Sequence, residues 1–516
     1  MTGTMGSRRR VVITGGLVVD GSGAPARPAD VSITGARVTD IAPPGAFGTV
    51  GADQVEDATG LIVCPGFIDA HSHADEAPLR ARDDTSKVLQ GVTTEVVGNC
   101  GESPDPASHG GFRGLYDDFD DAGYVTNYCP LVGHGMLRES VMGMSRRAPS
   151  ASDAREMSRM LEEALDAGAW GVSSGLMYAP GVFAEVDEMA DLVGHLPEGR
   201  VYATHVRDEG RHLRRSIDEA LEVARRAGVK LQISHLKAAG VPHWGTVESA
   251  LAQIDDARRD GVEVSQDVYP YDACSTTLLV CLPPWFLEGG REAVMRRLSD
   301  RDCLTRARKD VETWADDTWE NVVAADGYDR VHVAATASRE DEGRSLAELA
   351  EVHDLEPFEV LVDVLRRNAL DVTIVDFAMD EGDVLRVLRH SFTSVGTDGG
   401  TGLPEGDPHP RVHGSFPRVL GRYVREQRVL GIEDAVHKMT GRTADAFGLR
   451  GRGRLERGSV ADVVLFDPEV VSDRGTYVHP HVAPLGIRMV LQGGAVVVRD
   501  GTWLGTRRGK RLAPDR

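Results

Sequence analysis

Short hydrophobic runs separated by turn-forming residues characterise both ends of the chain. Residues 8–63 contain the runs VVITGGLVV, ADVSITGARV and LIV, and residues 450–516 contain VADVVLF and GIRMVLQGGAVVV. Apolar runs of this length bounded by Gly, Pro and Asp predict β-strands. We expect the two segments to pair into one small β-sandwich domain that is built from both ends of the chain.

The pattern changes over residues 64–449, where strand-like and helix-like segments alternate. GVTTEVVG, VYATHV and LQISHL have the pattern of short buried strands, whereas residues 153–167 and 433–448 have the apolar spacing of amphipathic helices. Repeated alternation of this kind predicts a parallel α/β fold, most simply a TIM-like (β/α)8 barrel. Residues 281–345 are charged and partly helical and break the alternation, which predicts an inserted lid or subdomain.

The chain shows no sign of a membrane segment. No apolar stretch approaches the length of about 18 residues that a membrane-spanning helix needs. Three arginines at residues 8–10 precede an apolar run, as in a secretion signal, but Gly15 and Gly16 interrupt that run, and we interpret it as the first β-strand. The 6 cysteines are too sparse for a disulfide framework, which favours a reduced, cytoplasmic protein.

Charge narrows the range of partners. The formal net charge of −22 disfavours nonspecific binding to nucleic acid or to anionic membranes. The H-x-E…P-C-x-x-C signature of polynucleotide deaminases is also absent from the sequence. We therefore expect a small-molecule partner and neither nucleic acid nor membrane. The sequence leaves the oligomeric state open.

Two histidines follow the apolar segment LIVCPGFIDA. Alternate residues of an extended strand point to the same side, so His71 and His73 face the same way. Two imidazoles in this arrangement can ligate one metal ion or two adjacent ones. The H-x-H pattern alone also occurs in polar loops, so its interpretation depends on partners elsewhere in the chain.

Such partners stand at the ends of other predicted strands. In a (β/α)8 barrel the carboxyl ends of all strands meet at one face, where enzymes of this fold have their active sites. A single cysteine is most often a small buried hydrophobic residue, but the joint placement of these residue types indicates a metal site. The candidate ligands are His71, His73, Cys100, His205, His235 and Asp398.

The ligand types suit zinc. Imidazole, thiolate and carboxylate groups are its usual ligands, and we expect one or two Zn²⁺ ions per chain. Bound zinc lowers the pKa of its water to about 7, so hydroxide is available at neutral pH to attack a carbonyl that the metal polarises. A nearby carboxylate must then take up the proton and deliver it to the leaving group. Asp398 is the candidate for this catalytic role.

Motifs that include these residues are spread over nearly the whole chain. They are PGFIDAHSHAD at 65–75, GVTTEVVGNCG at 91–101, LVGHGMLR at 131–138, GAWGVSSGLMYAPG at 168–181, THVRDEG at 204–210, SHLKAAG at 234–240, DVYPYDA at 267–273, GTDGG at 396–400, PHPRVHGSFPRVLG at 408–421 and GSVADVVLFDP at 458–468. With them the chain resembles the N-acyl-D-amino-acid deacylases (D-aminoacylases) of the amidohydrolase superfamily. The resemblance implies zinc-dependent hydrolysis of the amide bond of an N-acyl-D-amino acid, which gives a carboxylate and a free D-amino acid.

The resemblance also implies roles for individual residues. It makes the six candidate ligands the metal-site residues, with Cys100 in the place where many relatives use a carboxylated lysine. It further implies that Lys237 and Arg411 hold the substrate carboxylate. Three other positions that line the pocket in relatives correspond to Tyr178, Tyr269 and Ser275.

Two positions depart from the family pattern. Relatives usually have an aromatic residue where Glu102 follows Cys100 and Gly101, and tyrosine or tryptophan where His413 stands. These positions lie near the expected mouth of the site. The acyl-group and side-chain preference of the family therefore does not transfer directly to this chain.

Three alternatives stay open at this point. A hydrolase of cyclic amides, such as a hydantoinase or dihydroorotase, generally needs a bridging lysine in the barrel, and no lysine lies between Lys87 and Lys230. A deacylase of a specialised D-amide intermediate would keep the same site. A non-catalytic binding protein on this scaffold predicts the loss of a ligand or of Asp398, and all of these residues are present.

Overall fold

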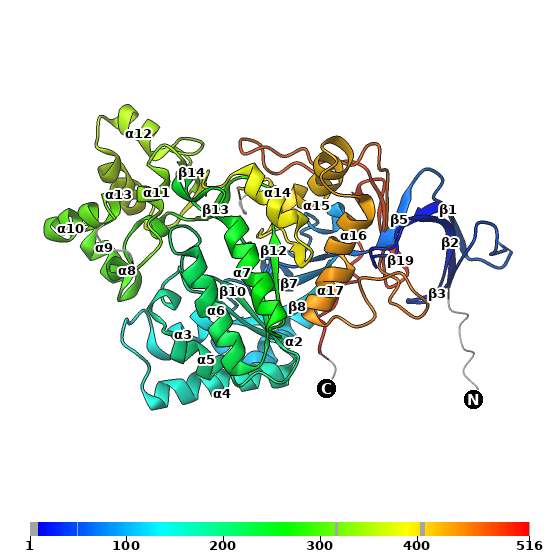
Figure 1. Cartoon of the computed structure of the whole chain (residues 1–516), viewed down its shortest axis with the longest axis horizontal. Helices are drawn as coiled ribbons and strands as arrows, with labels where there is room; N and C mark the ends of the chain where they lie inside the picture. Colours follow the sequence, from blue (N-terminus) through cyan, green and yellow to red (C-terminus); the bar gives the residue numbers. More distant parts are fainter. Residues whose placement is uncertain (1–8, 49, 315–317, 403–407, 515–516) are drawn as a thin grey trace.

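The structure, a computed structural model, describes residues 9–48, 50–314, 318–402 and 408–514. Figure 1 shows three parts in a row: a β-sheet near the amino terminus, a central α/β body and a further group of helices at the far end. The predicted outer limits at residues 8 and 516 lie outside the described residues, as do 315–317 of the predicted insertion and 403–407 of the predicted barrel.

The central body is a parallel eight-stranded barrel, as the strand-helix alternation predicts. Each strand pairs with its neighbour in parallel, in the order β16-β12-β11-β10-β9-β8-β7-β6. The Ala70 amide donates to the Val395 carbonyl over 3.2 Å and joins the two outermost strands, which closes the barrel. The strands are β6 (Phe67–Asp69), β7 (Val92–Val97), β8 (Asn127–Gly133), β9 (Gly171–Gly175), β10 (Val201–His205), β11 (Lys230–Ile233), β12 (Val264–Val268) and β16 (Thr393–Val395).

Helices cover the outside of the barrel. In α6 the buried residues Leu213, Ile217, Leu221 and Ala224 recur every three or four positions, so that one face packs on the strands. The helices around the barrel are α1 (Ala77–Arg80), α2 (Phe112–Ala122), α3 (His134–Met142), α4 (Ala151–Ala167), α5 (Val186–Val193), α6 (Leu213–Ala227), α7 (Val247–Arg259), α14 (Glu381–Arg389), α15 (Arg411–Arg418), α16 (Ile432–Met439) and α17 (Gly441–Phe447).

Two predicted helices have different outcomes. The helix predicted over 153–167 is confirmed as α4, where Ser150 and Asp153 form a reciprocal cap at the amino end. The single helix predicted over 433–448 is wrong, because the chain breaks into α16 and α17 at Thr440, which has φ −140° and ψ −87°. A side chain at Gly441 would lie 2.1 Å from the Gly21 carbonyl oxygen, so the break lets the second helix approach the amino-terminal segment closely.

A nine-stranded sheet combines strands from both ends of the chain (Figure 1, dark blue and red). Its centre is β5, which pairs in parallel with β1 and antiparallel with β17. The expected division of the chain after residue 63 stays a prediction, and β5 spans it. The strands are β1 (Arg10–Val18), β2 (Arg27–Thr34), β3 (Arg37–Ala42), β4 (Gln54–Asp57), β5 (Ile62–Pro65), β17 (Val463–Phe466), β18 (Ile487–Gln492), β19 (Ala495–Arg499) and β20 (Thr502–Trp503).

The third part contains the predicted insertion at 281–345 and has a hydrophobic core of its own. Its three-stranded sheet has the order β13-β15-β14, and β13 and β15 lie on either side of the predicted segment in sequence. The elements are β13 (Cys274–Thr277), α8 (Pro284–Leu287), α9 (Gly290–Arg297), α10 (Arg301–Glu312), α11 (Val322–Asp326), β14 (Val331–Thr336), α12 (Leu346–His353), α13 (Pro357–Arg367) and β15 (Val372–Asp376).

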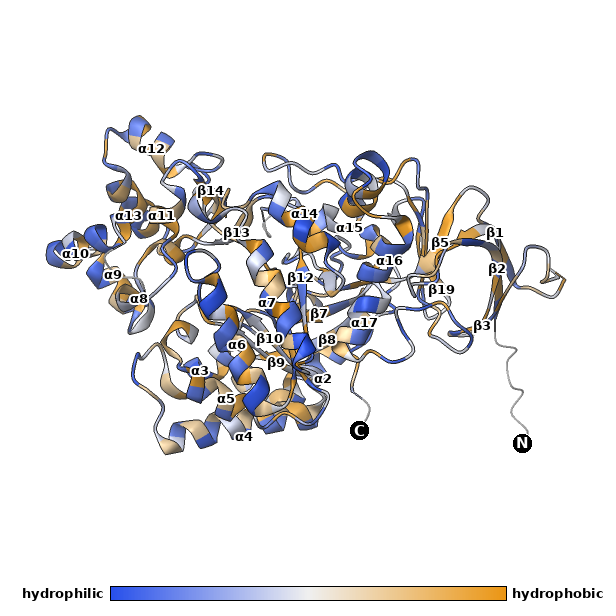
Figure 2. Ribbon diagram, viewed as in Figure 1, coloured by the Kyte–Doolittle hydropathy of each residue, from blue (hydrophilic) through white to orange (hydrophobic). Residues whose placement is uncertain are grey.

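Hydrophobic residues are distributed as a water-exposed fold requires. Figure 2 shows hydrophilic and hydrophobic residues side by side along most helices, so that these helices are amphipathic rather than apolar throughout. Over the described ranges, no helix combines the length and the apolar character that crossing a membrane would demand.

Candidate metal centre

The six predicted ligands all lie just beyond or at the carboxyl ends of barrel strands. His71 and His73 follow β6, Cys100 follows β7, His205 ends β10, His235 follows β11 and Asp398 follows β16. Because the strands are parallel, these ends meet at one face of the barrel.

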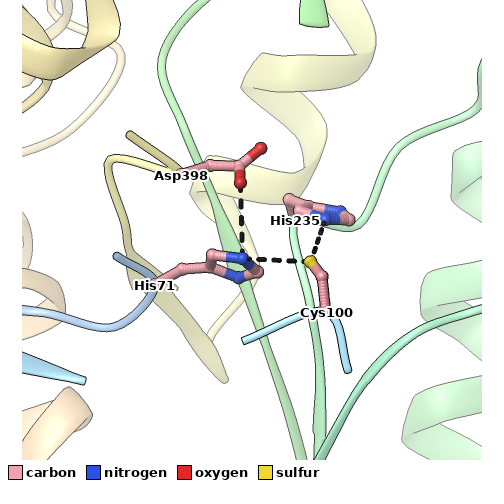
Figure 3. A group of neighbouring side chains, drawn as sticks. All are labelled: His71, Cys100, His235 and Asp398. Atoms are coloured by element: carbon pink, nitrogen blue, oxygen red, sulfur yellow. Dashed lines mark hydrogen bonds and ion pairs between the residues drawn. The ribbon is translucent and has the colours of Figure 1, made fainter. Parts of the chain in front are cut away.

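Four of these side chains form a compact buried group (Figure 3). The Cys100 Sγ lies 3.4 Å from His71 Nε2 and 3.5 Å from His235 Nε2. Asp398 Oδ1 lies 3.3 Å from the same His71 nitrogen. One ligand atom from each of the four residues lies within 4.8 Å of all the others, a spacing that one metal ion or a close pair can bridge.

His73 and His205 complete the set on opposite sides of this group. His73 Nε2 lies 3.2 Å from Asp398 Oδ1 and 3.3 Å from His71 Nε2. His205 Nδ1 lies 3.0 Å from His235 Nε2 and 3.9 Å from the Cys100 Sγ. The structure therefore brings all six predicted residues to one place.

The two acidic ligands are held in their charged forms. Burial opposes ionisation of the Cys100 thiol, but the imidazoles around it bring its pKa well below the ordinary value. Burial likewise opposes ionisation of Asp398, while Arg411 and the same imidazoles hold its pKa well below the usual range. Thiolate and carboxylate are the forms that bind metal, so the charge state of this donor set fits zinc.

The backbone at three of these residues is unusual. Cys100, His235 and Asp398 have φ values of 52°, 30° and 49°, in the left-handed region that residues other than glycine seldom adopt. Each turns the chain sharply at the end of its strand and directs its side chain into the barrel mouth. Such conformations concentrate at functional sites, where surrounding structure maintains them.

Two buried carboxylates that were not predicted support the histidines. Glu209 Oε1 lies 3.1 Å from His235 Nδ1, and Asp267 Oδ1 lies 3.3 Å from His71 Nδ1. A carboxylate on the second nitrogen of a histidine fixes the ring and its tautomer for metal binding. The sequence signal for Glu209 is its position four residues after His205, and for Asp267 its position near the end of the strand VSQDV.

The two cations predicted to hold the substrate carboxylate stand beside the metal ligands. Lys237 Nζ donates to both Glu209 carboxylate oxygens over 2.7 Å, and Arg411 Nη1 donates to Asp398 Oδ2 over 2.6 Å. The Tyr269 ring packs under both, 5.7 Å from Lys237 Nζ and 5.0 Å from the Arg411 guanidinium carbon. The Tyr269 ring thus holds the two cations in position. The Tyr269 hydroxyl donates a hydrogen bond to the Met379 sulfur.

The other two predicted pocket residues lie at the same site. The Tyr178 ring packs edge-on against His205 with centroids 4.9 Å apart, and its hydroxyl accepts from Thr276. The Ser275 carbonyl accepts from Arg411 Nη2 over 3.2 Å.

Most of these residues line one cavity of about 1010 Å³, which we call the metal-centre cavity, whereas His71 and Asp267 are buried outside its lining. A second cavity of about 1220 Å³ shares the side chains of Glu102, Tyr178 and Glu320 with it and extends under the inserted part. Together they leave ample room for a small-molecule substrate.

A cluster of imidazole, thiolate and carboxylate ligands at the carboxyl face of a closed (β/α)8 barrel defines the class of metal-dependent barrel hydrolases. The chain belongs to the amidohydrolase family, whose model matches residues 54–498.

Close relatives narrow the branch to the D-aminoacylases. The chain is 38% identical to the N-acyl-D-glutamate deacylase of Alcaligenes xylosoxydans xylosoxydans over 94% of this chain and 93% of that one. It is 35% identical to the D-aminoacylase of the same organism over 98% of this chain and 97% of the other. The crystal structure of N-acyl-D-glutamate deacylase from Bordetella bronchiseptica, complexed with zinc and a phosphonate mimic of the tetrahedral intermediate, superposes with a TM-score of 0.82 at 34% identity, covering 99% of this chain and 100% of that one.

Proposed function

We propose that the protein hydrolyses the amide bond of N-acyl-D-amino acids in a zinc-dependent reaction that yields a carboxylate and a free D-amino acid. The observation that carries this proposal is the meeting of a six-residue donor set, which includes the Cys100 thiolate, with Lys237 and Arg411 at the carboxyl ends of the barrel strands. Full-length similarity to D-aminoacylases and N-acyl-D-glutamate deacylases supports the stereochemistry and the type of bond.

The zinc site is proposed to use all six predicted ligands. Cys100, His205 and His235 lie close together on one side, and His71, His73 and Asp398 on the other, so the set has room for one ion or for two. Zinc bound here supplies a Lewis acid that makes water nucleophilic at neutral pH and polarises the scissile carbonyl. Asp267 and Glu209 hold the imidazoles His71 and His235 in ligating orientation.

Asp398 is the proposed proton carrier. Its Oδ1 faces His71 and His73, while its Oδ2 accepts from Arg411, so the carboxylate is fixed in the cavity with one oxygen toward the reacting atoms. Being ionised at rest, it can take a proton from the attacking water and pass it to the amide nitrogen as that nitrogen leaves.

Lys237 and Arg411 are the proposed anchors of the substrate carboxylate. Each is held in place by an acidic residue, so both cations stay charged and positioned beside the space that the substrate carboxylate enters. Tyr269 fixes the spacing of the two cations from below, and Tyr178 and Ser275 border the same space.

The alternatives are less well supported. A cyclic-amide hydrolase would need a bridging lysine, whereas Cys100 occupies the place between His71 and His235, and β9 contains no lysine. A deacylase of a specialised D-amide would use the same residues and differs only in the size of its substrate. A non-catalytic binding protein has no need of the complete ligand set. A cytoplasmic location is part of the proposal and rests on the 6 cysteines, which are all free.

The decisive experiment is a substrate screen on the zinc-loaded protein, with metal content measured on the same sample. We expect hydrolysis of N-acetyl-D-amino acids and little or no hydrolysis of their L-enantiomers. Activity confined to L-compounds or to hydantoins would overturn the proposal. So would equal activity after complete removal of the metal.

A further inference from the structure

The metal-centre cavity carries more acidic than basic side chains. Three cationic residues line it, and each already has a carboxylate partner: Arg80 with Glu76, Lys237 with Glu209 and Arg411 with Asp398. The cavity is also lined by six further carboxyl groups for which the described parts of the chain offer no ion-pair partner. These are Asp75, Glu102, Asp105, Glu139, Glu320 and Asp376.

Among these six carboxyl groups, Asp376 gives the clearest indication of a bound ligand. Its side chain is 3% exposed, and its Oδ1 atom is fully buried and has no hydrogen-bond partner within the described ranges. A buried carboxyl oxygen without a partner costs free energy unless something binds to it. Because Asp376 lines the cavity that holds the metal centre, an incoming substrate can supply that partner.

The position of Asp376 relative to the carboxylate anchors defines which part of the substrate reaches it. Asp376 on β15 is paired directly with Cys274 on β13, and the next residue on β13, Ser275, accepts a hydrogen bond from Arg411. Side chains paired across antiparallel strands lie about 5 Å apart. Burial raises the pKa of the Cys274 thiol, and Asp376, Lys237 and Arg411 all act on it electrostatically.

Cys274 thus lies near both the carboxylate anchors and Asp376. An amino acid whose carboxylate is held by Lys237 and Arg411 can reach Asp376 with the tip of a long side chain, while its acyl carbonyl lies at the metal ligands. Glu320 lines the same cavity from the inserted part, and its Oε2 accepts from the Glu209 amide over 2.7 Å, which fixes it next to the anchors.

We infer that the preferred substrates are N-acyl-D-amino acids with a cationic side chain, of the arginine or lysine type, which Asp376 binds at its charged end with help from Glu320. This inference rests on the proposed function. Burial and the neighbouring Asp326 raise the pKa of the Asp376 carboxyl well above its usual range, and a cationic side chain bound beside it favours the charged form again. An acidic side chain at this place brings no such gain. The N-acyl-D-glutamate deacylases among the relatives are named for a substrate with an acidic side chain, whereas the inferred preference of this chain is for a cationic one.

The test compares substrates that differ only in charge. N-acetyl-D-arginine and N-acetyl-D-citrulline have nearly the same shape, but the citrulline side chain is neutral. We expect the zinc-loaded wild-type protein to show a kcat/KM at least about tenfold higher for the arginine compound, and N-acetyl-D-glutamate to be the poorest of the series. N-acetyl-D-leucine serves as the reference for turnover without side-chain charge.

Variants then locate the effect. Asp376→Asn should reduce the arginine-to-citrulline ratio toward one through the KM for arginine, while hydrolysis of N-acetyl-D-leucine stays within about threefold of wild type. Asp105→Asn is the matched control, because Asp105 lines the same cavity but caps a turn after Cys100, and it should leave the ratio unchanged.

The outcomes separate the two proposals. If no N-acyl-D-amino acid is hydrolysed, the proposed function fails. If the leucine compound is hydrolysed but citrulline or glutamate compounds match or exceed the arginine compound, the cationic preference fails and the function stands. A ratio that Asp376→Asn leaves intact would also overturn the role of Asp376. The wild-type comparison holds even if that variant does not fold.

Discussion

Single residues set the chemistry of this site through charge and backbone conformation. Cys100, His235 and Asp398 hold left-handed backbone conformations that cost free energy, and all three are proposed ligands of the metal centre. Their side chains are buried with opposite charges in contact, which keeps the thiol and the carboxyl ionised. The donor geometry is therefore built into the protein before substrate arrives.

Asp398→Asn tests the proton carrier. The amide keeps the shape of the side chain but cannot accept and return a proton, so we expect kcat to fall by about 10²- to 10⁴-fold. Zinc content, measured by atomic absorption on the same preparation, separates loss of proton transfer from loss of metal. Near-normal turnover with zinc bound would show that another group carries the proton.

Glu209→Gln tests the support behind His235. Loss of the charge that fixes this imidazole should weaken zinc binding by about 10- to 100-fold, measured by competition with a chelating dye. Glu219→Gln is the matched control, because Glu219 pairs with Arg207 away from the donor set. Equal zinc affinities of wild type and Glu209→Gln would contradict the supporting role.

The same variant has a pH signature in the metal-free protein. Burial disfavours the Glu209 charge, but Lys237, His205 and His235 together outweigh it and lower the pKa from 4.5 to about 2. Because the pKa of Glu209 is lower in the folded protein than in the unfolded chain, its charge stabilises the folded state at pH values above about 4.5. This contribution is lost as the pH falls from about 4.5 toward 2. The difference in unfolding free energy between wild type and Glu209→Gln, measured in urea, should be full at pH 6 and shrink on acidification.

The limits of sequence interpretation at this scale follow from residue type. Histidines, a cysteine and an aspartate at strand ends are rare enough to be recognised, and the structure brings them together. Glu209 and Asp267 belong to a residue type that makes up much of the charged surface, since the chain has 80 acidic residues. Their importance comes from tertiary contacts with His235 and His71, which no local pattern encodes.

At the scale of elements, turns after the barrel strands deliver the ligands. Gly98 lies between β7 and Cys100 with φ 79°, and a side chain there would meet the Leu131 carbonyl oxygen at 2.2 Å. The turn therefore depends on a glycine both for its backbone conformation and for its close packing on β8. It fixes where the Cys100 thiol stands.

Gly98→Ala should displace this turn. We expect a destabilisation of about 1–3 kcal/mol and a loss of bound zinc, measured by chemical unfolding and metal analysis. Gly143→Ala is the control, because Gly143 also has positive φ (60°) but open space around it, so it reports strain without collision. If the two variants lose equal stability and Gly98→Ala keeps its zinc, the close packing of this turn is not what places Cys100.

Elements were predictable where local and tertiary preferences agree. The strand-helix alternation predicted the barrel because each unit has its own apolar pattern and its own turn. The break at Thr440 escaped prediction, since the apolar spacing continues across it and the cause is a contact between Gly441 and the distant Gly21. The sequence does not predict the full extent of the inserted part for the same reason, because β13 and β15 pair across about 100 residues of sequence.

For the whole molecule, a metal ion at the proposed site would link five of the barrel strands. Its proposed ligands follow β6, β7, β10, β11 and β16, so a bound ion cross-links the two strands where the barrel closes with those in between. A ligand that binds only the folded state stabilises it in proportion to the logarithm of its concentration over Kd.

Removal of zinc should therefore lower the melting temperature and abolish activity, and added zinc should restore both. A ligand at about 100 times its Kd contributes about 2.7 kcal/mol, which for a chain of this size corresponds to a shift of a few degrees. Cys100→Ala should start from the lower melting temperature and respond weakly to zinc, whereas Cys303→Ala, outside the site, should behave as wild type. An unchanged melting temperature after complete removal would contradict the cross-linking role.

The central position of β5 has a consequence for how the protein is made. On one side β5 pairs with β1, which is synthesised before it. On the other side it pairs with β17, which begins only at Val463 and is synthesised much later. The His71 and His73 pair emerges a few residues after β5, yet Asp398 and the sheet partner β17 are synthesised only near the end of translation. We therefore expect zinc insertion to be a late, largely post-translational event, and a prematurely terminated chain to display an unpaired β5 edge that cellular quality control can recognise.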